Sequence, residues 1–325
     1  MSGNSSQARS PVLPRVLPPA LRPGDGVGIV APASNIKQEA LLAGCEGLRR
    51  LGYKPVYFDS ILEQDLYFAG SVGRRVQELE AMFVREDVRA IVCSRGGYGC
   101  NYLVDNLNLA LIHQHPKIFM GYSDVTSLLT LLSDETGLVV FHGPMVTKDF
   151  LVDDGIDTAS WEAALGGVAS WSLADSGMKG LAAGSAEGVF YGGCLPMLTA
   201  TLGTRHEIQT AGTILFLEDI TSKPYQIDRM LMQLKQAGKF EGVRGIVFGE
   251  MNDCVQHPAQ TYTLEEVVMR VVGGLGIPVA FGLRSGHVAR RNITLPIGVR
   301  ASLMVTGVAA GDHAQLQFLE PATTA

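Results

Sequence analysis

Several features that mark other classes of protein are scarce in this sequence of 325 residues. Its five cysteines, at positions 45, 93, 100, 194 and 254, are scattered and form no Cys-x-x-Cys pair. That usage is typical of a reducing compartment and offers no zinc-finger spacing. No uncharged apolar run approaches the ~20 residues that a membrane helix needs. Residues 1–19 lack the apolar core of a secretory signal, so we expect a cytosolic protein with no membrane partner.

Positive charge is also in short supply. Lys plus Arg number 26 against 32 Asp plus Glu, a formal net charge of −6, so nucleic acid is not an expected partner. Hydrophobic residues make up 46% of the chain and charged residues 18%, which is enough to fill a core and excludes wholesale disorder. The length is more consistent with two domains than with one.

Strand and helix patterns alternate through the first half of the chain. Apolar runs predict strands at 27–32, 54–58, 88–94, 117–122 and 138–141, and helical spacing predicts helices at 38–51, 74–83 and 124–133. Such alternation implies a parallel sheet with both faces covered. We therefore expect an α/β fold with a first domain at 21–147, preceded by a flexible tail at 1–20.

The pattern changes after residue 147. Residues 148–184 are rich in Gly, Ala and Ser without a clear period, which predicts a linker. Beyond it we expect strands at 213–217 and 245–249, helices at 225–236 and from about 264, and short β-like runs at 293–298 and 300–307. Thr263 and Glu266 have the spacing of a capping box. The second domain, 185–325, should be mixed α/β, and no internal repeat is seen.

Two turns in the first half have the form of functional sites. In IVCSRGGYG (91–99) a strand ends in a glycine-rich turn, and the backbone N–H groups of such a turn can converge on an anion or an oxyanion. A tight turn that needs positive φ explains the glycines equally well. In KIFMGYSDVTSLL (117–129) Ser123 sits between a strand and a helix, a geometry that suits a nucleophile. Because Val125 replaces the last glycine of G-x-S-x-G, an ordinary helix N-cap is the alternative.

The second half supplies partners for such a nucleophile. The strand TILFLEDI (213–220) delivers Glu218 and Asp219 at its end, where a carboxylate can orient an imidazole or simply favour the next helix. His287 lies in the polar turn RSGHVARRN, and His142 in FHGPM is its one competitor. Ser123, Glu218 and His287 together would form a triad in a cleft between the domains. The rival from another class is a non-catalytic nucleotide or sugar-phosphate binding protein that uses the glycine turn.

Blocks spread from about residue 20 to residue 300 resemble the LD-carboxypeptidases of the muramoyl-tetrapeptide type, a serine peptidase family. They are LRPGDGVGIVAPAS, SRGGYG, GYSDVTSLL, FHGPM, YGGCLPMLTATLGT, LFLEDI with PYQIDRML, and SGH. The resemblance implies a flavodoxin-like or class I amidotransferase-like N-terminal domain, a smaller mixed α/β C-terminal domain, and a triad of Ser123, His287 and Glu218. Cys194 in YGGCL stands where asparagine is expected, so the resemblance does not define the chemistry of the pocket beside the triad.

The same resemblance implies an activity. Relatives of this type remove the terminal D-Ala from L-Ala-γ-D-Glu-meso-diaminopimelyl-D-Ala, the murein tetrapeptide of peptidoglycan recycling, in the bacterial cytoplasm, and a homodimer is suggested. A sister branch resembling microcin C self-immunity proteins acts on peptidyl-adenylate-like substrates, so the substrate stays open between the two.

The expected mechanism is an acyl-enzyme formed on the serine. Backbone N–H groups of Asp124 and of Gly96 or Gly97 would stabilise the oxyanion. Side chains near the glycine turn and near the histidine are candidates for binding the substrate and its carboxylates: Arg95, Tyr98, Arg290 and Arg291. No cofactor is expected, and no set of residues has the spacing of a metal site.

Overall fold

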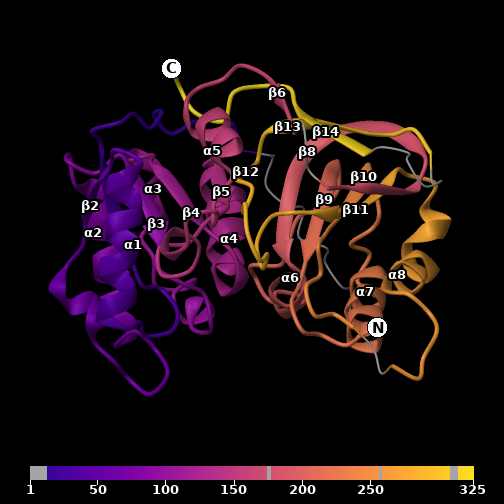
Figure 1. Cartoon of the computed structure of the whole chain (residues 1–325), viewed down its shortest axis with the longest axis horizontal. Helices are drawn as coiled ribbons and strands as arrows, with labels where there is room; N and C mark the ends of the chain where they lie inside the picture. Colours follow the sequence, from indigo (N-terminus) through magenta and orange to yellow (C-terminus); the bar gives the residue numbers. More distant parts are fainter. Residues whose placement is uncertain (1–12, 174–176, 256–257, 308–313) are drawn as a thin grey trace, which may run out of the picture.

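The computed structural model describes residues 13–173, 177–255, 258–307 and 314–325. Two β-sheets lie side by side, each with helices packed on it, and helix α5 (Thr158–Leu165) and strand β12 (Leu295–Ile297) lie between them (Figure 1). Among these residues, none of the helices combines the length and apolar character needed to cross a membrane.

The first sheet has six strands in the order β12-β5-β4-β3-β1-β2. Five are parallel: β1 (Gly26–Val30), β2 (Lys54–Val56), β3 (Ala90–Cys93), β4 (Ile118–Gly121) and β5 (Val140–His142). Its helices are α1 (Gln38–Arg50), α2 (Val72–Val84), α3 (Leu109–Gln114) and α4 (Thr126–Thr136). The order 2-1-3-4-5 is that of flavodoxin-like sheets, which confirms the expected fold of this domain.

The second sheet has eight strands in the order β6-β14-β13-β8-β9-β10-β11-β7. They are β6 (Trp171–Ser172), β7 (Lys179–Ala182), β8 (Gly184–Cys194), β9 (Thr213–Glu218), β10 (Gly245–Gly249), β11 (Val279–Leu283), β13 (Arg300–Val305) and β14 (Ala314–Phe318). Strands β8, β9, β10 and β11 are parallel and the others pair antiparallel, so the sheet has both kinds of pairing. Together with its helices it forms the mixed α/β domain that was predicted. It has more strands than the first sheet, although the smaller domain was expected here.

Helices α6 (Leu195–Ala200), α7 (Pro224–Gln236) and α8 (Leu264–Val272) belong to the second half. The predicted capping box is present at the start of α8, where the Thr263 and Glu266 side chains each accept from the other's backbone N–H. Short 3-10 segments complete the described structure: η1 (Asp59–Leu62), η2 (Cys100–Tyr102), η3 (Ser123–Val125), η4 (Asp149–Leu151) and η5 (Gly273–Leu275).

The domain limits differ from the sequence prediction in three places. Residues 1–12 of the expected tail lie outside the described residues, but Val16 forms a parallel bridge with Leu138 of the first domain. The expected linker contains α5, whose Trp161 is buried, and strand β7, which pairs with β11. Strand β12 returns from the second half of the chain and adds an antiparallel edge to the first sheet. Glycine and alanine in these segments therefore reflect close packing and not a free linker.

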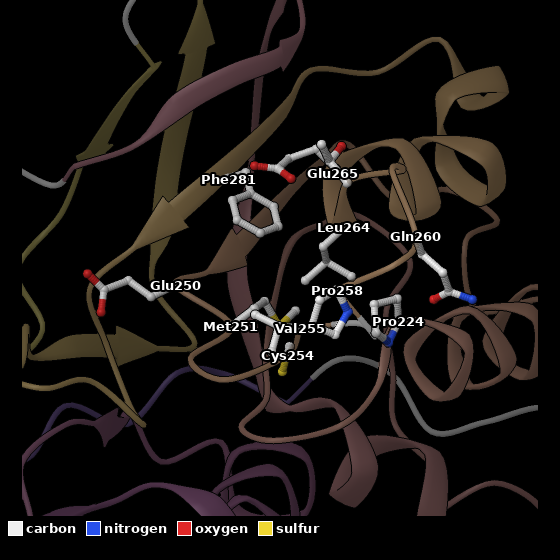
Figure 2. A pocket seen from close by; sticks show the side chains of 11 residues that line it. Pro224, Glu250, Met251, Cys254, Val255, Pro258, Gln260, Leu264, Glu265 and Phe281 are labelled. Atoms are coloured by element: carbon white, nitrogen blue, oxygen red, sulfur yellow. The ribbon is translucent and has the colours of Figure 1, made fainter.

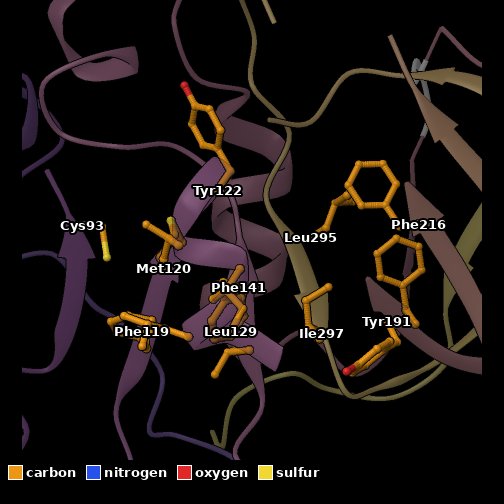
Figure 3. Packing of buried hydrophobic residues seen from close by; sticks show 14 of the residues in the cluster. Cys93, Phe119, Met120, Tyr122, Leu129, Phe141, Tyr191, Phe216, Leu295 and Ile297 are labelled. Carbon is orange, nitrogen blue, oxygen red and sulfur yellow. The ribbon is translucent and has the colours of Figure 1, made fainter. Parts of the chain in front are cut away.

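Strand β12 joins the two domains into one apolar core. Its Leu295 and Ile297 lie between Phe141 of the first sheet and Phe216 and Tyr191 of the second (Figure 3). All five side chains are buried. Because burial of large apolar side chains is the main stabilising contribution to folding, this shared core holds the two sheets in a defined relation.

Candidate active site

The serine predicted as nucleophile lies at a sharp turn between β4 and α4. Ser123 has a φ of 62°, a left-handed conformation that is uncommon outside glycine, and it opens the 3-10 segment η3. The turn requires glycine at position 121, because a Cβ there would come within 2.8 Å of a Val125 methyl group. Such local strain projects the hydroxyl out of the sheet and is frequent at active sites.

His287 and Glu218 meet this serine from the second domain. His287 Nε2 lies 3.0 Å from Ser123 Oγ, and His287 Nδ1 lies 2.8 Å from Glu218 Oε2. The backbone N–H of His287 donates to the same carboxylate oxygen at 3.2 Å. Since an ionised carboxylate only accepts hydrogen bonds, Nδ1 carries the hydrogen and Nε2 presents its lone pair to the serine hydroxyl. The structure thus brings the three predicted residues together in the order that proton transfer from serine requires.

The two buried partners shift each other's ionisation. Burial by itself would raise the pKa of the Glu218 carboxyl, but the charge on His287 and the polar contacts of His142 and His287 hold that pKa well below its ordinary value. Burial would lower the pKa of the His287 imidazole, yet the charge and hydrogen bond of Glu218 raise it above its ordinary value. A charged carboxylate next to a basic imidazole is the arrangement of a general base.

The glycine turn reaches the serine through Gly96. A Cβ added there would lie 2.7 Å from Ser123 Cβ and 3.3 Å from the backbone nitrogen of Asp124. In the described part of the chain the Gly96 N–H has no recorded acceptor, and the Asp124 N–H lies in the first turn of η3, where amides lack an internal acceptor. Gly97, with a φ of 113°, faces Ser34 instead. Of the two glycines considered, Gly96 is therefore the one beside the hydroxyl.

Two buried charged side chains anchor this turn; the sequence predicted a role only for the backbone N–H of Asp124 and none for Arg75. The Asp124 carboxylate accepts from the Cys100 N–H at 2.8 Å, which ties the turn to the residue after the serine. Arg75 donates to the carbonyl oxygens of Pro32 and Gly99 at 2.7 and 2.9 Å. No sequence signal indicates Arg75, because it lies on the buried face of an ordinary amphipathic helix.

The loop that carries His287 is held from the β10 side. The Asn252 side chain donates to the His287 carbonyl oxygen at 2.9 Å, and the Asn252 carbonyl oxygen accepts from the Thr221 N–H. Thr221, Met251 and Asp253 all have positive φ values, between 53° and 64°. Non-glycine residues in that region are uncommon, so their concentration around the imidazole indicates a loop held in place by its surroundings.

His142, the competitor for the role of base, lies behind the carboxylate. It is fully buried, and its Nδ1 lies 2.9 Å from Ser285 Oγ, whose hydroxyl donates to the Ile293 carbonyl oxygen. Its Nε2 lies 3.8 Å from Glu218 Oε1. The residue is therefore placed to influence Glu218 and does not face Ser123.

The four candidate binding residues lie in different surroundings. Arg95 and Tyr98 are exposed on the glycine turn, with the Arg95 guanidinium directed to the Asn35 carbonyl oxygen at 3.5 Å. Arg290 is exposed, whereas Arg291 forms an ion pair with Asp154 at 3.1 Å.

A pocket of about 350 Å³ lies in the second domain, between the loop after β10 and the start of α8 (Figure 2). Apolar side chains, among them Met251, Leu264 and Phe281, line it together with Glu250. Burial raises the pKa of Glu250, while the nearby charges of Arg284 and Arg290 lower it. Arg290 is thus the predicted binding residue that lies closest to this pocket's carboxylate.

One cluster of donor atoms could hold a metal ion. Within the described residues, donor atoms of Cys194, Glu218 and His287 lie within 4.8 Å of one another. The three residues are distant in sequence, which is why no spacing pattern indicated them.

Comparison with known proteins shows the family of this chain. Models of the N-terminal and C-terminal domains of LD-carboxypeptidases match residues 27–143 and 187–303. The chain belongs to the LD-carboxypeptidase family. A probable murein peptide carboxypeptidase of Bacillus subtilis is 38% identical over 88% of this chain and 91% of that protein. The microcin C7 self-immunity protein of Escherichia coli is 28% identical over 86% and 90%.

A solved structure supports this LD-carboxypeptidase fold along nearly the whole chain. The crystal structure of muramoyltetrapeptide carboxypeptidase from Oxalobacter formigenes superposes with a TM-score of 0.81 at 28% identity. It covers 92% of this chain and 100% of that chain. The two-sheet architecture is therefore shared with this solved relative.

Proposed function

We propose that this LD-carboxypeptidase is a serine peptidase that releases the terminal D-Ala from the murein tetrapeptide by cutting its bond to meso-diaminopimelate. The observation that carries the proposal is the continuous chain of contacts from Ser123 Oγ to His287 and on to Glu218, at 3.0 and 2.8 Å. The murein peptide carboxypeptidase relative from Bacillus subtilis supports the substrate class.

The mechanism starts with attack of Ser123 Oγ on the carbonyl carbon of the L-configured centre of diaminopimelate. His287 Nε2 takes the hydroxyl proton, and Glu218 stabilises the imidazolium that forms. N–H groups of Gly96 and Asp124 stabilise the oxyanion, each worth about 3–4 kcal/mol when aligned. His287 then gives its proton to the amine of D-Ala, which leaves. Water, activated by the same imidazole, hydrolyses the acyl-enzyme.

Recognition of the anionic substrate falls to basic side chains near the serine. Arg95 and Tyr98 stand on the turn that carries Gly96, so they are the first candidates for the free carboxylate of D-Ala. Arg290 is available for a more distant carboxylate. Arg291 is the weakest of the four candidates, because Asp154 already neutralises its charge.

The test is the Ser123→Ala variant. We expect it to lose release of D-Ala from the tetrapeptide while keeping its circular dichroism spectrum and thermal unfolding midpoint. Ser127→Ala is a matched control, because Ser127 lies in the next turn, is buried and has no side-chain partner in the described residues. Near-normal turnover by Ser123→Ala would exclude the serine mechanism.

The alternative substrate is tested in the same assay. The similarity to the microcin C7 self-immunity protein favours peptidyl-adenylate-type substrates as the second candidate. Higher kcat/KM for an aminoacyl-sulfamoyl or peptidyl-adenylate analogue than for tetrapeptide would move the assignment to that class. Saturable phosphate binding without hydrolysis of either would instead support a nucleotide or sugar-phosphate binding protein. A homodimer in the bacterial cytoplasm is part of the proposal, to be tested by light scattering and cell fractionation.

A further inference from the structure

Cys194 is placed beside Glu218 by the register of the second sheet. In the parallel pair β8 and β9, Cys194 is the register partner of Glu218, and partners in a ladder project their side chains from the same face. The Cys194 N–H donates to Thr126 Oγ1 at 3.1 Å, which fixes the end of β8 against the start of α4. The thiol is therefore held next to the carboxylate by backbone pairing and not by a mobile loop.

His287 completes a set of three different donor groups. A thiol, a carboxylate and an imidazole have donor atoms within 4.8 Å of one another. Cys194 and Glu218 are 5% and 2% exposed, and His287 is less deeply buried. Glu218 Oε1 is also buried, makes no hydrogen bond in the described residues and lies 3.8 Å from His142 Nε2. Glu218 Oε2, the oxygen nearest to His287 Nδ1, is the carboxylate donor available to a cation.

We propose that Cys194, Glu218 and His287 form an inhibitory site for a thiophilic divalent cation, Zn²⁺ or Cd²⁺. Sulfur, nitrogen and oxygen donors are the set that zinc prefers, with bonds of about 2.3, 2.0 and 2.1 Å. Donors of a tetrahedral site with those bonds are about 3.3–3.7 Å apart. To reach this spacing the Nδ1 and Oε2 atoms, now 2.8 Å apart, move slightly away from each other, and donor atoms of the cluster that lie up to 4.8 Å apart move closer.

Binding at this site stops the proposed proton transfer. His287 Nδ1 and Glu218 Oε2 are 2.8 Å apart, so a cation bound to both takes the place of the proton between them. That proton moves to Nε2, and the thiol proton of Cys194 goes to solvent as the thiolate binds. A hydrogen on Nε2 faces Ser123 Oγ and leaves no lone pair to accept the hydroxyl proton. The effect on turnover rests on the proposed function, whereas binding itself does not.

The experiment titrates the full chain with Cd²⁺ and follows the ultraviolet charge-transfer band of a cadmium–thiolate bond. We expect one equivalent to bind in the wild type and in Ser123→Ala, whose metal donors are intact. Cys194→Ala should lose the band and bind at least ~10-fold more weakly, because a direct ligand is removed. Cys45→Ala is the matched control, since Cys45 is also buried but lies in α1 of the first domain.

Activity gives the second measurement. Zn²⁺ and Cd²⁺ should inhibit D-Ala release by the wild type and by Cys45→Ala, with recovery on addition of a chelator. Cys194→Ala should keep its own metal-free rate of D-Ala release at cation concentrations that inhibit the wild type. An unchanged band and affinity in Cys194→Ala, or no band in the wild type, would overturn the site. A band in a chain that shows no peptidase activity would keep the site and reject the proposed function.

Discussion

Replacement of Glu218 by glutamine isolates the charge that the second domain places beside His287. The carboxylate oxygen and Nδ1 are 2.8 Å apart, which puts the two charge centres about 4 Å apart. At an effective dielectric constant of about 20, unit charges at that separation interact by about 4 kcal/mol. Loss of this stabilisation of the imidazolium corresponds to roughly a 10³-fold drop in kcat/KM.

The structure also indicates that glutamine preserves the histidine tautomer. Both Nδ1 and the backbone nitrogen of His287 are directed to the same oxygen, Oε2. Two converging N–H donors favour the amide oxygen of glutamine at that position. The amide NH₂ then takes the place of Oε1, 3.8 Å from His142 Nε2. The loss of activity should therefore be smaller than the ~10⁴-fold loss in kcat that follows when replacement of a triad's acid leaves the histidine in the wrong tautomer.

The assay is D-Ala release from tetrapeptide, measured as kcat/KM across pH. In the wild type, activity should rise with pH as His287 loses its proton, and that rise should be centred above the ordinary histidine pKa because Glu218 raises it. In Glu218→Gln the centre should move to lower pH. A variant with kcat/KM within tenfold of the wild type, or with an unmoved acid limb, would refute the electrostatic reasoning.

Three further changes test the surroundings of the site. Gly96→Ala puts a Cβ 2.7 Å from the nucleophile's Cβ, so kcat should fall about 10² or more, whereas Gly73→Ala, where nothing lies within 4 Å, should leave turnover unchanged. Asp124→Ala removes the acceptor of the Cys100 N–H and so releases the glycine turn, and we expect kcat to fall by a larger factor than KM changes. Asp124→Asn keeps an acceptor oxygen and should restore much of the lost kcat. Equal loss of kcat in both variants would contradict a tethering role. Burial raises the pKa of Asp149 to about 6. Its folded-state pKa thus exceeds its unfolded value, so stability relative to Asp149→Asn should fall by about 2 kcal/mol as pH rises from 4 to 7. A pH-independent difference between the two proteins in urea unfolding would exclude this.

Parts of both domains could be predicted from the sequence because their signals are local. The strand at 245–249 and the capping box at Thr263 match the structure as predicted, and the helix at 38–51 differs by one residue. Strand β8 was missed, since its alternation is interrupted by Gly188, Gly192 and Gly193. Gly193 stands there because a Cβ would lie 2.8 Å from the Thr126 side chain. A packing requirement between distant elements thus interrupts the alternation by which a strand is recognised.

The sequence by itself determined the alternation of strands and helices, the positions of Ser123 and Glu218 at the ends of predicted strands, and the position of His287 in a polar turn. Periodicity and turn residues act between neighbours in the chain, so one sequence is enough to show them. Only the tertiary structure decided that Gly96 and not Gly97 adjoins the serine, that Cys194 lies beside Glu218, and that β12 joins the first sheet. These relations depend on sheet register and on contacts between remote segments, which leave no local pattern in the chain.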